Sequence, residues 1–276
     1  MTYNQFRIKA EKLLENSGID DIKPEIIQLV CGVCGITQAE YLAKRGEDIP
    51  EEKACELEQK LERRLCGEPL QYVLGEWEFC GLRMLCGKGC LIPRWETEML
   101  VQSAVSLIPQ NGKVLDLCTG SGCISVAILK NRPDVTATAV DISPEALEYA
   151  RRNAELHGVS ERLTLVCGDV ADFTVQGRAD VIVSNPPYVK THDVDAFDKT
   201  MQFEPRIAFD GGKDGLDFYR TIISRFVPTL QKGGVMLFEA GFDTTENVAQ
   251  LMKNAGLETG IMPDVNGIPR ACIGVK

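Results

Sequence analysis

Basic residues are in the minority in this chain of 276 residues, where 30 lysines and arginines stand against 40 aspartates and glutamates. The net charge is −10, and neither the first 75 residues nor the remainder is basic. Nucleic-acid binding depends largely on the neutralisation of phosphates by lysine and arginine. We therefore expect no direct nucleic-acid partner.

Long apolar runs are missing as well. The longest candidate, residues 26–36, is interrupted by Gln28 and two glycines, and it is shorter than the ~18 residues that a spanning helix needs. The first residues show no basic segment followed by an apolar one, and the chain contains no Asn-x-Ser/Thr acceptor for glycosylation. We expect neither export nor a membrane partner.

The chain has only two histidines, and its 11 cysteines do not form a complete set of metal ligands. Cys80, Cys86 and Cys90 lie close together in the sequence, but no second pair and no nearby histidine accompanies them, so we expect no metal. An odd number of cysteines scattered along a mid-sized chain is typical of reduced thiols rather than of a disulfide framework. The expected location is therefore the cytoplasm.

The pattern of apolar residues divides the chain into three regions. Residues 1–70 show helical spacing throughout and predict a small helical bundle, suited to recognition rather than to chemistry. Residues 71–93 contain short β-type runs between glycines, the first of them at 72–74, and predict a hairpin that links two domains. Residues 94–276 form the candidate catalytic domain.

Strands and helices alternate in the third region. The predicted strands lie at 113–117, 135–140, 163–166, 179–184 and 234–240. This alternation predicts an α/β fold with a doubly wound parallel sheet and right-handed crossovers. Ligands of such sheets bind beyond the carboxyl ends of the strands, which is where the unusual residues of this chain are found.

Glycines and carboxylates follow the first three of these strands. Gly120 and Gly122 let the backbone approach a ligand at the N-terminus of the next helix. Asp141 is placed to accept hydrogen bonds from ribose hydroxyls, and Asp169 is placed near an adenine. The pattern indicates a nucleoside-containing cofactor, either a dinucleotide or S-adenosylmethionine. The third glycine of the dinucleotide fingerprint is absent, and Ile124 stands in its vicinity.

The fourth strand ends at Ser184-Asn185-Pro186-Pro187-Tyr188. Neither proline can donate a backbone hydrogen bond, and each keeps the preceding residue extended. The segment therefore offers an amide side chain, carbonyl oxygens without local partners and an aromatic ring, which suits a planar NH2 group. An isolated Asn-Pro-Pro run is more often a simple turn, but after the glycine turn and Asp141 it favours S-adenosylmethionine as the cofactor.

The chain resembles class I S-adenosylmethionine-dependent methyltransferases in Asp116-Leu-Cys-Thr-Gly-Ser-Gly122, Asp141, Asp169 and Asn185-Pro-Pro-Tyr188. Further segments make it similar, over nearly its whole length, to the peptide chain release factor glutamine methyltransferases (HemK/PrmC type). These segments are 67–75, 91–98, 203–206 and 214–219. Two residues depart from the family pattern: Cys118 stands where the loop usually has glycine, and Trp95 where it usually has proline.

The resemblance implies a Rossmann-like methyltransferase domain joined by a β-hairpin to the helical domain. It implies S-adenosyl-L-methionine as cofactor, S-adenosyl-L-homocysteine as product, and release factors as protein substrates, methylated on the side-chain nitrogen N5 of a Gly-Gly-Gln glutamine. The implied substrate-binding and catalytic residues are Asn185, Pro186, Pro187 and Tyr188. The implied cofactor-binding residues are Asp116, Cys118, Thr119, Gly120, Ser121, Gly122, Asp141, Asp169, Val170, Asn185 and Thr97.

Three alternatives stay open on the sequence. A nucleic-acid adenine N6-methyltransferase would offer the same NH2 geometry and the same tetrapeptide, but the net charge of −10 speaks against it. A ribosomal-protein glutamine methyltransferase is a closer alternative, although the segment 94–98 favours the release-factor group. A non-catalytic binding module is the third, and the intact Gly120, Gly122, Asp141 and Asn185 argue against it.

Overall fold

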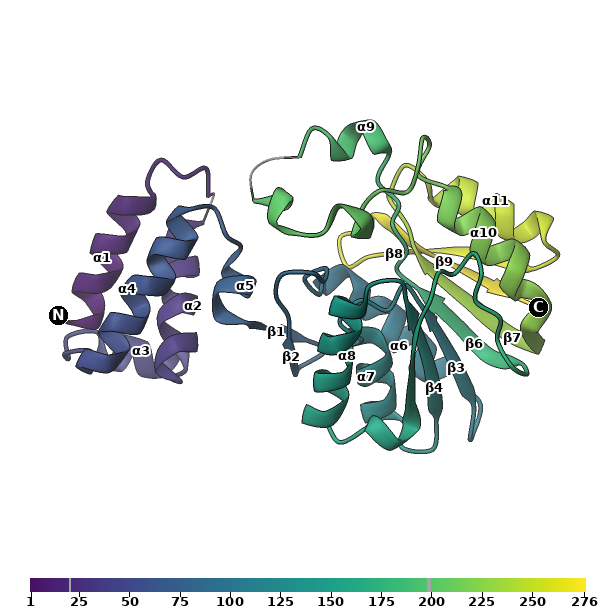
Figure 1. Ribbon diagram of the computed structural model, residues 1–276, viewed down its shortest axis with the longest axis horizontal. Coiled ribbons are helices and arrows are strands. Elements are labelled where there is room, and N and C mark those ends of the chain that lie inside the picture. Colours follow the sequence, from purple (N-terminus) through teal and green to yellow (C-terminus); the bar gives the residue numbers. More distant parts are fainter. Residues whose placement is uncertain (20, 198–199) are drawn as a thin grey trace. The chain divides into compact units, whose positions relative to one another are not determined.

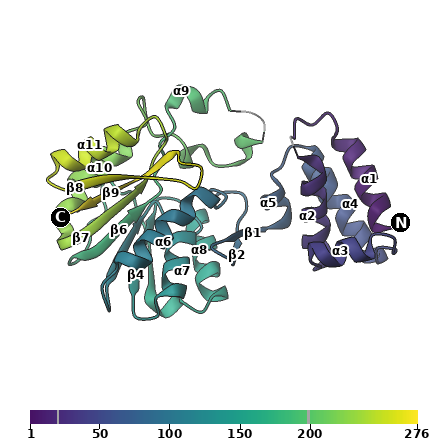
Figure 2. The same ribbon diagram turned by 180° about the vertical axis from the view of Figure 1, so that it is seen from behind.

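The computed structural model describes residues 1–19, 21–197 and 200–276, which form two compact units (Figures 1 and 2). The first unit comprises Met1–Glu76 and a short segment that ends at Phe203. The second comprises Trp77–Phe197 and Glu204–Lys276. The division into a recognition region that ends at residue 70 and a linker that ends at residue 93 stays a prediction.

The first unit is helical. Its helices are α1 (Tyr3–Leu14), α2 (Ile22–Cys34), α3 (Gln38–Lys44), α4 (Glu51–Leu65) and α5 (Leu70–Leu74). The amphipathic helices α1, α2 and α4 pack on one another and bury Phe6, Leu29 and Leu57. Within the described ranges no single helix is long and apolar enough to span a membrane, and α2 and α3 satisfy that test only together, across a 94° bend.

The β-type run predicted at 72–74 is wrong, because these residues belong to helix α5. Pro69 precedes the helix as its N-cap, and Gly75 ends it in the left-handed conformation at φ 85°. Tyr72 and Val73 are both buried, although the helix has only 5 residues. A run of three apolar residues fits a strand and a buried helix equally well, so its flanking proline and glycine were the better signal.

The predicted hairpin is present over a shorter span, as strands β1 (Glu76–Phe79) and β2 (Leu82–Leu85). Its two-residue turn has positive φ at both positions, 52° at Cys80 and 69° at Gly81. Such turns match the right-handed twist of the strands that they join. Cys80 is a rare occupant of this conformation, because a side chain with a Cβ is strained there.

A seven-stranded sheet forms the centre of the second unit, in the order β5-β4-β3-β6-β7-β9-β8. The strands are β3 (Lys113–Leu117), β4 (Thr136–Asp141), β5 (Leu163–Cys167), β6 (Ala179–Ser184), β7 (Leu230–Glu239), β8 (Glu258–Pro263) and β9 (Pro269–Val275). The predicted α/β fold is confirmed, and β3 to β7 pair in parallel. Strands β8 and β9 form a hairpin, so β9 runs antiparallel to β7.

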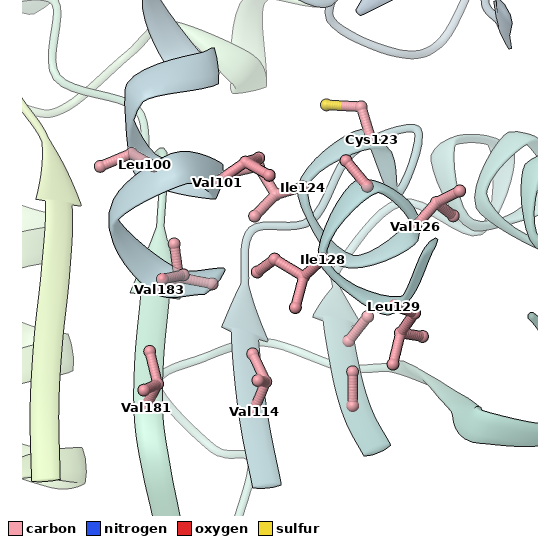
Figure 3. Packing of buried hydrophobic residues seen from close by; sticks show 14 of the residues in the cluster. Leu100, Val101, Val114, Cys123, Ile124, Val126, Ile128, Leu129, Val181 and Val183 are labelled. Carbon is pink, nitrogen blue, oxygen red and sulfur yellow. The ribbon is translucent and has the colours of Figure 1, made fainter. Parts of the chain in front are cut away.

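Helices cover both faces of this sheet (Figures 1 and 2). On one face lie α6 (Glu98–Leu107), α7 (Cys123–Asn131) and α8 (Pro144–Leu156), and on the other lie α10 (Asp217–Phe226) and α11 (Thr245–Asn254). Side chains alternate along each strand, so Val114 packs with α6 and α7 whereas Leu115 packs with α10. Figure 3 shows Ile124 of α7 beside Val101 of α6, and Ile128 of α7 on the side of Val114 of β3.

The predicted long irregular segment 189–215 contains short helices in its described part; residues 198–199 lie outside the described residues. These elements are α9 (Thr191–Val194), η3 (Met201–Phe203) and η4 (Arg206–Ala208). Val189 pairs with this segment, donating to the Phe209 carbonyl (2.8 Å) and accepting from the Gly211 amide (2.8 Å). The pairing anchors the segment directly behind Tyr188. The other 3-10 helices are η1 (Trp95–Thr97), η2 (Ser160–Arg162) and η5 (Val227–Thr229).

Candidate active site

A cavity of about 240 Å³ opens at the carboxyl ends of β3, β4, β5 and β6, as the sheet topology predicts. Most of the expected site residues lie in its wall: Thr97, Cys118, Thr119, Gly120, Ser121, Asp141, Asp169, Val170, Asn185 and Pro187. The remaining four, Asp116, Gly122, Pro186 and Tyr188, are outside the lining. The structure therefore brings the first group to the cavity wall, and the other four residues lie within two positions of that group in the sequence.

The turn between β3 and α7 has an unusual backbone. Three of its residues have positive φ: 58° at Cys118, 57° at Gly120 and 75° at Gly122. Gly122 also packs tightly, because a Cβ added there would lie 2.9 Å from the Cβ of Ala150. At Gly120 an added Cβ would meet no protein atom within 4 Å, so this glycine keeps space open beside the turn.

Asp116 supports this turn from beneath. Its side chain is fully buried, and its Oδ2 accepts hydrogen bonds from the hydroxyls of Thr119 and Ser125, each at 2.6 Å. Burial raises the pKa of Asp116 to about 6, and the two hydroxyl donors only partly oppose the rise. Because Asp116 alternates with the buried Leu115 and Leu117, it points toward α7 and fixes the start of that helix.

Asp141 bridges two strand ends. Its Oδ2 accepts from the Gly120 amide (2.7 Å), and its Oδ1 accepts from the Ser143 amide (2.9 Å) at the start of α8. Burial raises the pKa of the Asp141 carboxyl, while these backbone donors oppose the rise. Asp169 follows β5 and accepts from the Ala171 amide at 2.8 Å. Each carboxylate keeps lone pairs that can accept from a ligand in the cavity.

The segment after β6 combines one cavity-lining side chain with a fixed backbone. The Asn185 Nδ2 donates to Thr97 Oγ1 at 3.1 Å. No described residue donates to the Asn185 side-chain oxygen or to the Pro186 carbonyl oxygen, so both acceptors are unengaged. Behind this segment, a Cβ at Gly211 would come within 2.7 Å of the Pro187 oxygen.

Tyr188 lies in a different environment from the one expected. Its ring packs against the core cluster between the sheet and α10, and its hydroxyl donates to Glu239 Oε1 at 3.3 Å. Burial raises the pKa of the Tyr188 hydroxyl, with Glu239 contributing further. The expected contact of this ring with a substrate amide stays a prediction.

The segments 91–98 and 203–206 meet through Glu204. This buried carboxylate accepts from the Ile92 amide at 2.8 Å and from Arg94 Nη2 at 2.5 Å. The contact holds the following residues, Pro205 and Ile207, in the cavity wall. Its two partners are separated from Glu204 by more than a hundred residues, and so no local pattern could predict the link.

Sequence reasoning missed several lining residues and one buried acid. Ile142, Ala146, Ala208 and Phe218 give the cavity an apolar wall that is typical of ligand sites. Glu239 closes the apolar run Val-Met-Leu-Phe-Glu of β7 and is only 2% exposed. A carboxylate inside such a run was the available signal, because charged residues are almost never buried without a partner.

The lining suits a nucleoside cofactor. Carboxylates at two strand ends can accept from hydroxyl groups, Gly120 keeps backbone space open, and Ile142 and Val170 offer apolar contact to a planar base. The chemistry of this wall therefore fits S-adenosylmethionine, with two carboxylates for hydroxyls and an apolar surface for adenine.

Fold and cavity together define a class I methyltransferase. Residues 96–204 match the family model of the methyltransferase small domain, and residues 5–75 match that of the PrmC N-terminal domain. Trm5 of Methanocaldococcus jannaschii, solved in complex with adenosine, has a similar fold, with a TM-score of 0.51 and 17% identity over 73% of this chain and 54% of its own.

Similarity to curated proteins is closer and extends over nearly the full length. A release factor glutamine methyltransferase of Geobacter sulfurreducens is 37% identical, covering 95% of this chain and 92% of its own. That of Moorella thermoacetica is 32% identical, covering 100% and 99%. The chain belongs to the release factor glutamine methyltransferase family.

Proposed function

We propose that this protein transfers a methyl group from S-adenosylmethionine to the side-chain amide nitrogen of the glutamine in the Gly-Gly-Gln tip of release factors. The observation that carries the proposal is Asn185, which lines the cavity beside the strand-end carboxylates and whose carbonyl oxygen accepts from no residue that the structure describes. The names of full-length relatives support the choice of substrate. A substrate of this kind and the scattered free cysteines favour the cytoplasm as the location.

The cofactor would be held by the residues that line the cavity. Asp141 would accept from ribose hydroxyls, Asp169 and Val170 would adjoin the adenine, and the turn 118–122 would contact the rest. When bound, S-adenosylmethionine supplies an electrophilic methyl group on a positively charged sulfur. Asp116 and Gly122 lie behind this wall, so we assign them to the support of the turn rather than to contact.

The protein's task is to orient an unreactive nitrogen. The lone pair of an amide nitrogen is delocalised into the carbonyl group, which makes the nitrogen a poor nucleophile. Asn185 Oδ1 and the Pro186 carbonyl oxygen would accept its two N–H groups and return electron density to the nitrogen. Orientation and electrostatics carry this catalysis, and the proton is released to solvent after the transfer.

The N-terminal region, residues 1–70, is proposed to recognise the release factor, and residues 71–93 to link it to the catalytic region, 94–276. Deleting residues 1–70 is expected to raise the KM for the release factor while the affinity for S-adenosylmethionine stays within a few-fold. Calorimetric titration of the cofactor would check the second part. Loss of cofactor binding in a folded deletion variant would contradict this division of labour.

The test of the function is a transfer assay with labelled S-adenosylmethionine. Release factor, its variant with alanine in place of the Gly-Gly-Gln glutamine, and duplex DNA are offered side by side. We expect label on the unaltered release factor alone. Label on DNA would favour adenine methylation instead, and equal label on the alanine variant would refute the proposed target residue.

A further inference from the structure

Behind Asn185 lies a continuous chain of hydrogen bonds that the proposed chemistry does not yet use. Asn185 Nδ2 donates to Thr97 Oγ1 at 3.1 Å, and Thr97 Oγ1 donates to Glu239 Oε2 at 2.5 Å. Thr97 and Glu239 are each only 2% exposed. The three residues come from the end of β6, from η1 and from the end of β7, so the chain joins elements that are distant in the sequence.

The direction of these hydrogen bonds follows from the number of hydrogens that each group can donate. A threonine hydroxyl has one hydrogen, and an ionised carboxylate can only accept. When Glu239 is ionised, the Thr97 hydrogen points to it, and Thr97 can then only accept from Asn185. The NH2 end of the Asn185 amide must therefore face Thr97. Its carbonyl oxygen must face the other way, where no described residue engages it.

We propose that Glu239 is a positioning residue, which acts through Thr97 to keep the carbonyl oxygen of Asn185, rather than its NH2 group, available to the substrate amide. The inference rests on the proposed function, because only a substrate NH2 group requires an acceptor at this position. An Asn185 side chain turned by 180° would oppose one NH2 group to another. Glu239 touches neither substrate nor cofactor in this scheme, since it is outside the cavity lining.

Protonation of Glu239 would reverse the direction of the hydrogen bonds that link Glu239, Thr97 and Asn185. A protonated carboxyl can donate to Thr97, whose hydrogen is then free to turn toward Asn185, and the amide gains by presenting its oxygen there instead. The charged or titratable groups facing Glu239 are Tyr188, Glu96 and Arg270, while the Tyr219 hydroxyl donates to its backbone oxygen at 2.7 Å.

These surroundings place the reversal in an accessible pH range. Burial raises the pKa of Glu239 to about 6; the hydrogen bonds from Thr97 and Tyr188 oppose the rise, Glu96 adds to it, and Arg270 opposes it. The wild-type enzyme should therefore lose transfer activity as the pH falls through about 6. If Glu239 only stabilised the fold, the transfer rate of the folded, cofactor-binding protein would not follow the ionisation of this one residue.

The first test needs no release factor. In the full-length protein, the side-chain NH2 signals of Asn185 in a ¹H–¹⁵N spectrum should shift with a midpoint near pH 6. The shift should be absent in Glu239→Gln, which carries no titratable group at this position. A wild-type Asn185 signal that does not respond between pH 5 and 7, or one that titrates equally in Glu239→Gln, would overturn the inference whatever the substrate proves to be.

The second test is kinetic and uses a matched pair of variants. Thr97→Ser keeps the hydroxyl and should retain the maximal rate within a few-fold together with its acid limb. Thr97→Val has nearly the same shape without the hydroxyl, and it should lose about 10²-fold in kcat and show no acid limb. Because Thr97 also lines the cavity, cofactor affinity is measured by calorimetry in both variants, and kcat is compared at saturating S-adenosylmethionine.

The outcomes separate the inference from the function. Wild-type turnover of release factor with an unchanged pH profile in Thr97→Val would overturn the positioning role and leave the function standing. Absence of turnover in the wild type, together with an Asn185 signal that titrates through Glu239, would refute the proposed substrate and leave the hydrogen-bonded chain standing.

Discussion

Two buried carboxylates, Asp116 and Glu239, stand on the strands that flank β6 on either side. Both accept hydrogen bonds from hydroxyl groups, and burial raises the pKa of each to about 6. Their partners differ. Thr119 and Ser125 follow Asp116 within nine residues, whereas Thr97 is 142 residues away from Glu239.

The difference indicates two kinds of support in one site. Asp116 organises a local turn that is already set by its own sequence, and that turn is the one proposed to contact the cofactor. Glu239 joins separate elements, and its chain of hydrogen bonds ends on Asn185, the side chain proposed to hold the substrate. Loss of Asp116 should therefore affect cofactor binding and stability, and loss of Glu239 the rate of transfer.

The largest effect on the rate of methyl transfer is expected at Asn185, the side chain proposed to bind the substrate amide. Asn185→Ala should lower the rate of methyl transfer by about 10³-fold, the cost of removing a group that stabilises developing charge. Cofactor affinity should stay within a few-fold, as measured by calorimetry. The exposed Asn254→Ala provides a matched control with an unchanged rate. An Asn185→Ala enzyme that still turns over at the wild-type rate would remove the basis of the proposed mechanism.

The next effect separates the two carboxylates. Asp116→Ala leaves two buried hydroxyls without their acceptor and should lower the free energy of unfolding by about 3 kcal/mol. It should also weaken cofactor binding at least tenfold because the turn 118–122 loses its support. Glu239→Ala should lower the transfer rate while cofactor affinity stays within a few-fold. Equal loss of cofactor affinity in both variants would show that the two carboxylates do not have separate roles in cofactor binding and in methyl transfer.

The dependence on pH should move in opposite directions for stability and for rate. Because the folded pKa values of Asp116 and Glu239 are raised from 3.8 and 4.5 to about 6, the native state retains protons that the unfolded chain releases. Their contribution to stability is therefore fully present below about pH 4 and is lost as the pH rises through about 6. The transfer rate should rise over the same interval as Glu239 ionises.

Substitutions at Asp116 and Glu239 show which carboxylate causes each dependence on pH. Asp116→Asn should flatten part of the stability profile from chemical denaturation and leave the acid limb of the rate in place. Glu239→Gln should flatten its own part of the stability profile and abolish the acid limb. An acid limb that follows Asp116 rather than Glu239 would reverse the assignment.

The smallest effect is expected at Cys118, on the Asp116 side. Its φ of 58° is strained for a residue with a Cβ, so Cys118→Gly should raise the free energy of unfolding by about 1 kcal/mol. The matched control is Cys55→Gly, exposed within helix α4, which should lower it by about 1 kcal/mol. Thermal denaturation would measure both, and a change of the same sign in the two variants would contradict the strain at Cys118.

The sequence predicted the parts of the fold that are encoded locally. The β3 strand follows from the apolar run at 113–117, and the glycine turn follows from Gly120 and Gly122, both of which have positive φ in the structure. Helix α5 was misread because three apolar residues carry too little periodicity. The links through Glu204 and Glu239 were not predictable, because their partners are brought together only by the tertiary fold.

Methylation of the glutamine side-chain nitrogen is tested most directly by the chemical form in which the transferred methyl group is recovered. Release factor labelled by the purified enzyme would be hydrolysed completely in acid, and the labelled product identified. Methylation of the glutamine side-chain nitrogen predicts that the label is recovered as methylamine, because hydrolysis of the amide releases the nitrogen with its methyl group. Label that stays on an amino acid, or that is released as methanol, would place the methyl group on another atom and contradict methylation of the side-chain nitrogen.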